Sequence, residues 1–283
     1  FPKPSAARFA ELNCGRRKWS APGKKSPNRY FSPQIRRVFY FSPCSLRLCV
    51  ELNVIVHQNR SARPKSMESF SEELRAEAKP IWDRIFQKPF LWEIKDGTLP
   101  LAKFQYYLGQ DYMYLEGFAR TVALALAKAP SSQHLEDLSH RVLTPVERPL
   151  HHKLVAAAGL TMDEIKLAKP SPTNTAYMNH MLKTASLHGL GATAAALLPC
   201  PWTYHELKDE LGPSEHPLYG QWTEFYVAGF LQSSVDAWRG FVDDAAKEAS
   251  PAELEAMREA FMISSRYEFM FWDMAYTMEQ WPA

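Results

Sequence analysis

The chain has 283 residues, and its 33 Lys and Arg nearly balance 31 Asp and Glu, for a formal net charge of +2 at pH 7. The charges are unevenly distributed, because residues 1–66 hold 14 basic and 2 acidic residues whereas residues 67–283 hold 19 and 29. No run of 18 or more apolar residues occurs, so we predict no membrane-spanning helix. The acidic part is long enough for one domain with a substantial core.

Residues 1–66 form a basic leader without a steady hydrophobic period, and we expect most of it to be poorly ordered. Its composition is typical of an organelle transit segment, and also of a basic arm that contacts nucleic acid. Because the chain begins with Phe1 and Met67 opens a helix-like segment, we favour a leader that derives from gene prediction or cloning. We predict no nucleic-acid partner, since the acidic domain would oppose one.

The cysteines are divided in the same way as the charges. Cys14, Cys44 and Cys49 lie in the leader, and Cys200 is the single cysteine of residues 67–283. A lone cysteine argues against a disulfide framework and for a reducing compartment. We therefore expect a cytoplasmic protein, with organellar targeting by the leader as the open alternative.

From Met67 onward, apolar residues recur every three or four positions between breaks marked by proline, and alternating β-branched runs are nearly absent. This period predicts a single all-α domain over residues 67–283. Ser250, Pro251 and Glu253 supply an N-cap, a first-turn proline and a capping glutamate for the last helix. The expected helices span residues 68–88, 101–128, 131–142, 145–158, 162–167, 172–188, 190–198, 201–211, 215–232, 233–248 and 251–280.

The helix expected over residues 101–128 carries a charge where its buried face should be apolar. Its regular stripe runs through Phe104, Leu108, Asp111, Leu115, Phe118, Val122 and Ala125. Burying a carboxylate costs several kcal/mol unless it is paired, protonated or facing a polar cavity. Asp111 is therefore either a structural ion-pair partner or a group that lines a pocket.

Cys200 lies in a helix break further along the chain. Pro199 and Pro201 flank it, and each proline fixes its own φ and lacks an N–H. A side chain at such a break can point into a cavity. The alternative is a small buried hydrophobe, the commoner role of a free cysteine.

The last expected helix repeats the pattern seen at Asp111, with Glu268 in the middle of an apolar stripe that includes Phe261 and Phe271. Two such acids and a thiol between prolines indicate one internal pocket, with a nucleophile and two groups able to move protons. The many aromatic side chains of the domain are mostly core, but a subset could form a slot for a flat ring.

Four runs of residues together resemble the TenA/thiaminase II family, in order and at plausible spacing over essentially all of residues 67–283. They are Tyr107–Leu115, Pro172–Tyr177, Leu198–Tyr204 and Arg266–Tyr276. The resemblance implies a haem-oxygenase-like helical bundle with an internal pocket, assembled as a homotetramer.

The resemblance further implies a hydrolase that uses no metal or organic cofactor and acts in thiamin salvage. Such enzymes convert 4-amino-5-aminomethyl-2-methylpyrimidine to the hydroxymethyl compound, and many also split thiamin. By position, the family's nucleophilic cysteine falls on Cys200, its late glutamate on Glu268 and its early aspartate on Asp111. The substrate-binding tyrosines fall on Tyr114, Tyr177, Tyr204 and Tyr226.

Two alternatives share the fold. Glu147 and His151 have the i, i+4 spacing of metal ligands and favour a di-metal oxidase, but Pro145 and Pro149 disturb that helix and no second pair accompanies it. A non-catalytic pyrimidine-binding or regulatory protein would be expected to lack the thiol or one of the acids, and all three are present.

Overall fold

The structure is a computed structural model that describes residues 69–143 and 148–282. These residues form helices and no strand, so the all-α prediction is confirmed. The predictions for residues 1–66, and the part of the di-metal alternative that depends on Glu147, lie outside the described residues. The helices are α1 (Phe70–Ile85), α2 (Pro89–Lys95), α3 (Leu101–Leu126), α4 (Ser132–Leu143), α5 (Arg148–Ala157), α6 (Met162–Leu167), α7 (Pro172–Leu187), α8 (Leu190–Leu197), α9 (Pro199–Glu210), α10 (Tyr219–Val227), α11 (Gln232–Glu248) and α12 (Pro251–Thr277).

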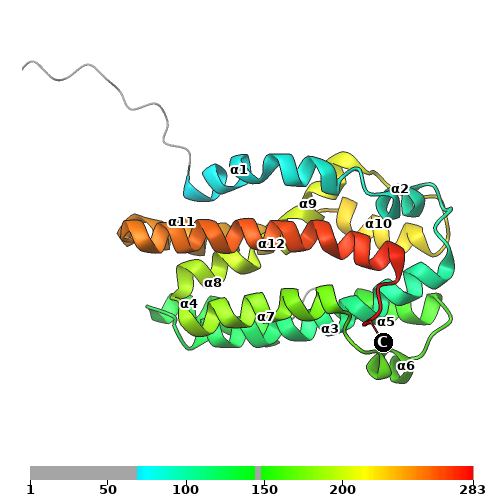
Figure 1. The fold of residues 1–283 in the computed structure, drawn as a ribbon, viewed down its shortest axis with the longest axis horizontal. Coiled ribbons are helices and arrows are strands. Elements are labelled where there is room, and N and C mark those ends of the chain that lie inside the picture. Colours follow the sequence, from blue (N-terminus) through cyan, green and yellow to red (C-terminus); the bar gives the residue numbers. More distant parts are fainter. Residues whose placement is uncertain (1–68, 144–147, 283) are drawn as a thin grey trace, which may run out of the picture. The chain divides into compact units, whose positions relative to one another are not determined.

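The bundle is organised around α12, which packs against α1, α3, α7, α8 and α9. Figure 1 shows α1, α12 and α7 in successive layers with roughly parallel axes. The capping box of Ser250 and Glu253 is present at the start of α12, as the sequence predicts. Because α12 is 27 residues long and packs against these five helices, it brings side chains from all of them close together.

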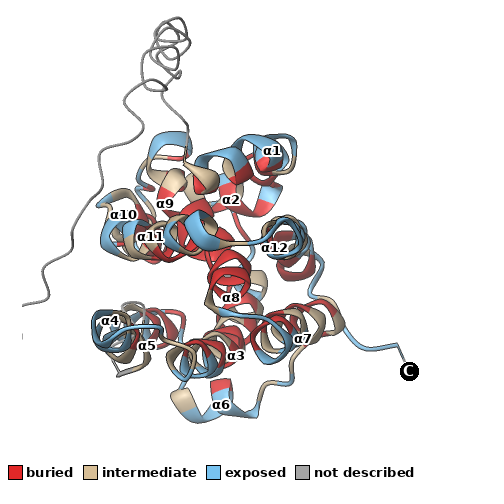
Figure 2. Cartoon of the chain, turned by 90° about the vertical axis from the view of Figure 1, so that its left-hand side faces the viewer, coloured by how far each residue is buried: buried red, intermediate tan, exposed pale blue. Residues whose placement is uncertain are grey.

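Helix α8 is the most enclosed element, and Figure 2 shows it red in the middle of the bundle. Its residues from Gly191 to Leu197 are all buried, as expected for a helix that is apolar on every side. A Cβ atom on Gly191 would lie 2.7 Å from the Cβ of Ala245 on α11 and 3.0 Å from the sulfur of Met257 on α12. The absent side chain therefore sets how closely these helices pack.

Several helix ends differ from the prediction. Helix α2 is absent from the prediction. It is a separate seven-residue helix that begins at Pro89, shortly after α1 ends at Ile85. The helix expected over 215–232 is only Tyr219–Val227, because His216 Nδ1 accepts hydrogen bonds from the backbone N–H groups of Leu218 and Tyr219 in a loop. Gly229, with φ of 75°, follows its end.

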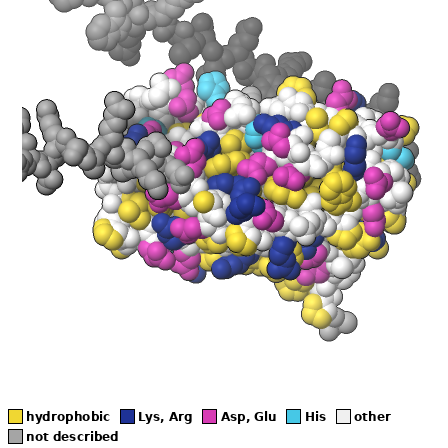
Figure 3. Space-filling model, turned by 90° about the horizontal axis from the view of Figure 1, so that it is seen from above, with side chains coloured by type: hydrophobic (Ala, Val, Ile, Leu, Met, Phe, Trp, Pro, Cys, Tyr) yellow, Lys and Arg dark blue, Asp and Glu magenta, His cyan; other side chains and the backbone are white. Residues whose placement is uncertain are grey.

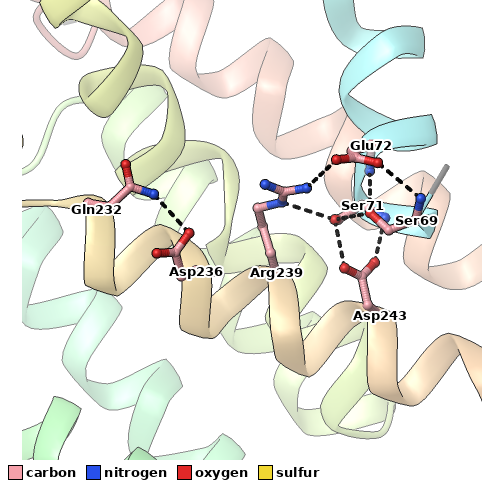
Figure 4. A network of polar contacts seen from close by, with 7 residues as sticks. All are labelled: Ser69, Ser71, Glu72, Gln232, Asp236, Arg239 and Asp243. Carbon is pink, nitrogen blue, oxygen red and sulfur yellow. Dashed lines mark hydrogen bonds and ion pairs between the residues drawn. The ribbon is translucent and has the colours of Figure 1, made fainter.

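The start of α1 is fastened to α11 by the polar network in Figure 4. The carboxylate of Asp243 accepts hydrogen bonds from the backbone N–H and the hydroxyl of Ser71, at 2.8 and 3.0 Å. Arg239 donates to the Ser71 hydroxyl and to Glu72. The same guanidinium lies 4.9 Å from the ring centre of Trp202, so the network also contacts α9.

Basic, acidic and apolar side chains are interspersed on the described part of the face in Figure 3, with no single patch of either charge. Among residues 69–143 and 148–282, no helix is long and apolar enough to cross a membrane.

Candidate active site

Glu268 is the buried acid at the centre of the bundle. It comes from α12 and is 2% exposed, and its Oε1 accepts a 2.7 Å hydrogen bond from the hydroxyl of Tyr177 on α7. Burial, followed by the nearby charge of Glu268, raises the pKa of Tyr177 well above its usual value. Tyr177 therefore stays protonated and donates to the carboxylate.

Cys200 occupies the first turn of α9, directly after the first helical residue, Pro199. The helix thus begins two residues earlier than expected and includes the cysteine. Its thiol is buried and lies near Tyr114 on α3, whose pKa is raised first by burial and then by the Cys200 charge. The Tyr114 hydroxyl donates to the Met181 sulfur at 3.8 Å. The rings of Tyr114 and Tyr177 lie 5.1 Å apart. These two tyrosines therefore connect the thiol to Glu268.

Asp111 forms the other side of the site, one turn before Tyr114 on α3. It lies close to Tyr204 of α9, whose pKa is raised by burial first and then by neighbouring groups that include Asp111 and Glu268. Tyr226 of α10 contacts Tyr204, with ring centres 4.9 Å apart. Asp111 and Tyr226 also line one small cavity together.

The seven residues proposed from the sequence thus come from five helices: α3, α7, α9, α10 and α12. Cys200, Tyr114, Tyr177 and Glu268 form one group, and Asp111, Tyr204 and Tyr226 form the other. The two groups are neighbours, because the charges of both Asp111 and Glu268 contribute, after burial, to the raised pKa of Tyr204. The fold therefore gathers residues that lie as far apart as 111 and 268 in the sequence.

Three further residues at this site were not singled out as site residues from the sequence. Trp222 Nε1 donates a 3.2 Å hydrogen bond to the hydroxyl of Tyr107, which lies 3.4 Å from the hydroxyl of Tyr204. Phe271 packs against Tyr114 at 5.8 Å between ring centres. All three belong to aromatic stripes that look like ordinary core in the sequence, so spacing alone gives no signal for them.

From the sequence, His151 is interpreted only as a candidate metal ligand. It is buried, and its Nε2 donates a 2.9 Å hydrogen bond to the backbone carbonyl of Leu108. In the described part of the chain, no group of three or more His, Cys, Asp or Glu side chains is arranged to hold a metal ion.

Residues 75–278 match the model of the TENA/THI-4/PQQC family. The chain belongs to this family. The resemblance inferred from the four sequence runs is confirmed.

The three curated relatives named aminopyrimidine aminohydrolase at 31–36% identity match over 92–98% of their own length. An aminopyrimidine aminohydrolase of Halalkalibacterium halodurans is 36% identical over 220 residues, which are 75% of this chain and 98% of the relative.

The solved structures extend the family match to the fold. A TenA homologue from P. horikoshii OT3 is 30% identical, with a TM-score of 0.67 over 74% of this chain and 99% of its own. A putative TenA-like thiaminase from Sulfolobus solfataricus is 25% identical, with a TM-score of 0.64 over 75% and 98% of the two chains. A domain from Shewanella denitrificans with a haem-oxygenase-like fold matches at a TM-score of 0.60 over 74% and 92%, with 14% identity. The last match concerns the fold alone, and it confirms the haem-oxygenase-like bundle.

Proposed function

We propose that this protein hydrolyses thiamin-derived aminopyrimidines, with Cys200 as nucleophile, in the salvage of the pyrimidine half of thiamin. The expectation of an enzyme is confirmed by relatives named aminopyrimidine aminohydrolase at 31–36% identity. The net reaction replaces the amino group of the 5-aminomethyl substituent of 4-amino-5-aminomethyl-2-methylpyrimidine with a hydroxyl from water and releases ammonia. Thiamin, which carries the same ring with thiazole as leaving group, is the second proposed substrate.

The observation that carries the proposal is the buried pair of Tyr177 and Glu268 beside a thiol. A carboxyl group at 2% exposure, held by a 2.7 Å hydrogen bond, can transfer a proton in a site that excludes water. Tyr114 links this pair to Cys200. The proposed nucleophile and proton donor are thus close to the rings of Tyr114, Tyr177 and Phe271, and aromatic side chains can stack on a flat substrate ring.

The chemistry of the ring explains why these groups are needed. An aminopyrimidine is a poor electrophile until a ring nitrogen is protonated, and a carboxylic acid beside it can supply that proton. The thiolate then adds to a ring carbon, the protonated amine or thiazole departs from the methylene carbon, and water adds there. Expulsion of the thiolate regenerates Cys200 and restores the aromatic ring.

Each residue has a proposed role in these reaction steps. Cys200 lies in the first turn of α9, where the helix dipole favours negative charge on a thiol. Glu268 transfers the proton to the leaving group, and Asp111 holds the amino group and nitrogen of the ring. Tyr177 and Tyr204 orient these groups, while Tyr114 or Tyr226 stacks on the ring.

The decisive experiment incubates the protein with aminomethylpyrimidine or with thiamin and follows the release of hydroxymethylpyrimidine. Wild type should turn over at least one of them, and Cys200→Ala should lower turnover by orders of magnitude without unfolding. Unchanged turnover in the variant would rule out covalent catalysis. No turnover of either compound by the wild type would reject the proposed function.

Three further parts of the proposal can be tested on the same protein. We propose that the protein forms a homotetramer and resides in the cytoplasm. Size-exclusion chromatography with light scattering would test the oligomeric state, and cell fractionation would test the location. We propose that residues 67–283 are the catalytic domain, so deletion of residues 1–66 should leave activity unchanged. We also propose that no metal takes part, so that exhaustive chelation should not reduce turnover.

A further inference from the structure

His151 is a buried histidine that the proposed mechanism does not use. It projects from α5 toward α3 and is 4% exposed. Since a carbonyl oxygen only accepts, the 2.9 Å contact with Leu108 O places the ring proton on Nε2. The contact therefore fixes both the tautomer and the orientation of the imidazole.

The same N–H lies beside the carboxylate of Asp111. Nε2 is 3.7 Å from Asp111 Oδ2, which is one turn after Leu108 on α3. At this length the interaction is a dipole facing a charge rather than a full hydrogen bond. The imidazole can attract the carboxylate oxygen without neutralising it, because burial lowers the pKa of His151 to about 4 and keeps the ring uncharged.

The two side chains also share a wall of the site. Asp111 and His151 line the same small cavity, together with Trp222 and Tyr226. The other ring nitrogen, Nδ1, is buried and has no hydrogen-bond partner among the described residues. A buried polar atom without a partner costs free energy, and such atoms in native proteins call for a functional explanation.

We propose that His151 is a positioning residue that orients the Asp111 carboxylate toward the substrate ring through its Nε2–H. The inference rests on the proposed function, since it assigns Asp111 to the amino group and nitrogen of an aminopyrimidine. It predicts that affinity for the substrate ring depends on the N–H donor at the ε position of residue 151, and not on the size or the charge of the imidazole.

Two substitutions separate these properties. His151→Gln places an amide N–H near the ε position, whereas His151→Asn reaches only as far as the δ position. We expect His151→Asn to weaken binding of 4-amino-5-hydroxymethyl-2-methylpyrimidine roughly tenfold, because the N–H dipole that faces the Asp111 carboxylate is lost and the carboxylate is no longer held toward the ring. His151→Gln should stay within about threefold of the wild type. His180→Asn is the matched control, because His180 Nε2 also meets a backbone carbonyl, that of Ala260, and it should bind like the wild type.

The measurement is calorimetric titration of the full chain with this pyrimidine, combined with a double-mutant cycle against Asp111→Asn. If His151 acts through Asp111, His151→Asn costs little further affinity once Asp111 is replaced. The rate at which iodoacetamide alkylates Cys200 should be the same in all His151 variants, because that group is not positioned by His151.

Equal losses in His151→Asn and His151→Gln, or fully additive losses in the cycle, would overturn the inference. So would wild-type affinity in His151→Asn, which would leave the proposed function intact. If the wild type itself does not bind the pyrimidine, the proposed function falls, and the inference falls with it.

Discussion

The hydroxyl of Tyr177 donates a 2.7 Å hydrogen bond to Oε1 of Glu268, across 91 positions of sequence and between two helices, α7 and α12. Both side chains are buried. Because burial and the Glu268 charge hold the pKa of Tyr177 well above its usual value, the donor keeps its proton at neutral pH. The bond therefore fixes the orientation of a buried carboxylate.

Removing the Tyr177 hydroxyl should affect catalysis more than folding. We expect Tyr177→Phe to lower kcat by roughly 10- to 100-fold, since one charge-assisted hydrogen bond that orients Glu268 is lost. Tyr267→Phe is the control, because Tyr267 stacks on Tyr177 at 5.1 Å between ring centres. Steady-state kinetics on both variants would decide, and equal losses would show that only ring packing matters.

Glu268→Gln tests whether the buried acid is catalytic or structural. The change is nearly isosteric and leaves an amide oxygen to accept from Tyr177, so thermal stability should change little. Turnover should fall by two or more orders of magnitude, because an amide cannot transfer the proton. A large loss of melting temperature with activity retained would instead make Glu268 a structural group.

The contact between Tyr114 and Cys200 predicts a change in thiol reactivity. A phenol dipole close to the sulfur stabilises the thiolate, so Tyr114→Phe should slow alkylation of Cys200 roughly tenfold near neutral pH. The pH profile of alkylation should move upward by about one unit. Tyr276→Phe, which removes a hydroxyl bonded to Glu93 on the outer side of α12, should leave the profile unchanged.

His151 should make stability depend on pH in a defined window. Its pKa is about 4 in the folded protein, chiefly because of burial, against about 6.5 when unfolded. Above pH 6.5 the ring is neutral in both states. As the pH falls below 6.5 the unfolded chain takes up a proton that the folded protein does not, so the free energy of unfolding drops, by about 2 kcal/mol at pH 5.

Denaturant unfolding of the wild type and His151→Gln at pH 7 and pH 5 would measure this term. The variant cannot titrate at this position, so it should lose less stability over the interval. His152→Gln, an exposed neighbour, should lose as much as the wild type. Identical losses in all three proteins would contradict the assigned pKa.

Two glycines give opposite predictions for the same substitution. Gly191→Ala places a Cβ 2.7 Å from that of Ala245 and should lower the free energy of unfolding by about 1–3 kcal/mol through overpacking. Gly240→Ala, in α11 with nothing within 4 Å, should raise it by roughly 0.5–1 kcal/mol through helix propensity. Chemical denaturation of both variants would test the role of α8 as the spacer of the bundle.

Most of the fold could be predicted from the sequence because helical period and capping are local properties. The segment 162–167 was predicted with the same ends as α6, where Thr161 and Glu164 form a capping box. Helix α2 was missed, since seven residues between two breaks carry too little period to recognise. The expected start of α9 at Pro201 was wrong because proline is well tolerated in the first turn, where no helical N–H bond is required.

For the candidate site, the sequence pattern alone singled out three groups as candidates: Asp111 and Glu268 on apolar stripes, and Cys200 between prolines. The cost of burying such groups makes their position informative without any partner being known. The neighbours of these groups became known from the packing of the helices: Tyr177 for Glu268, Tyr114 for Cys200 and His151 for Asp111. Each partner comes from a different helix, and helical period fixes which face of a helix is buried but not which neighbour covers it.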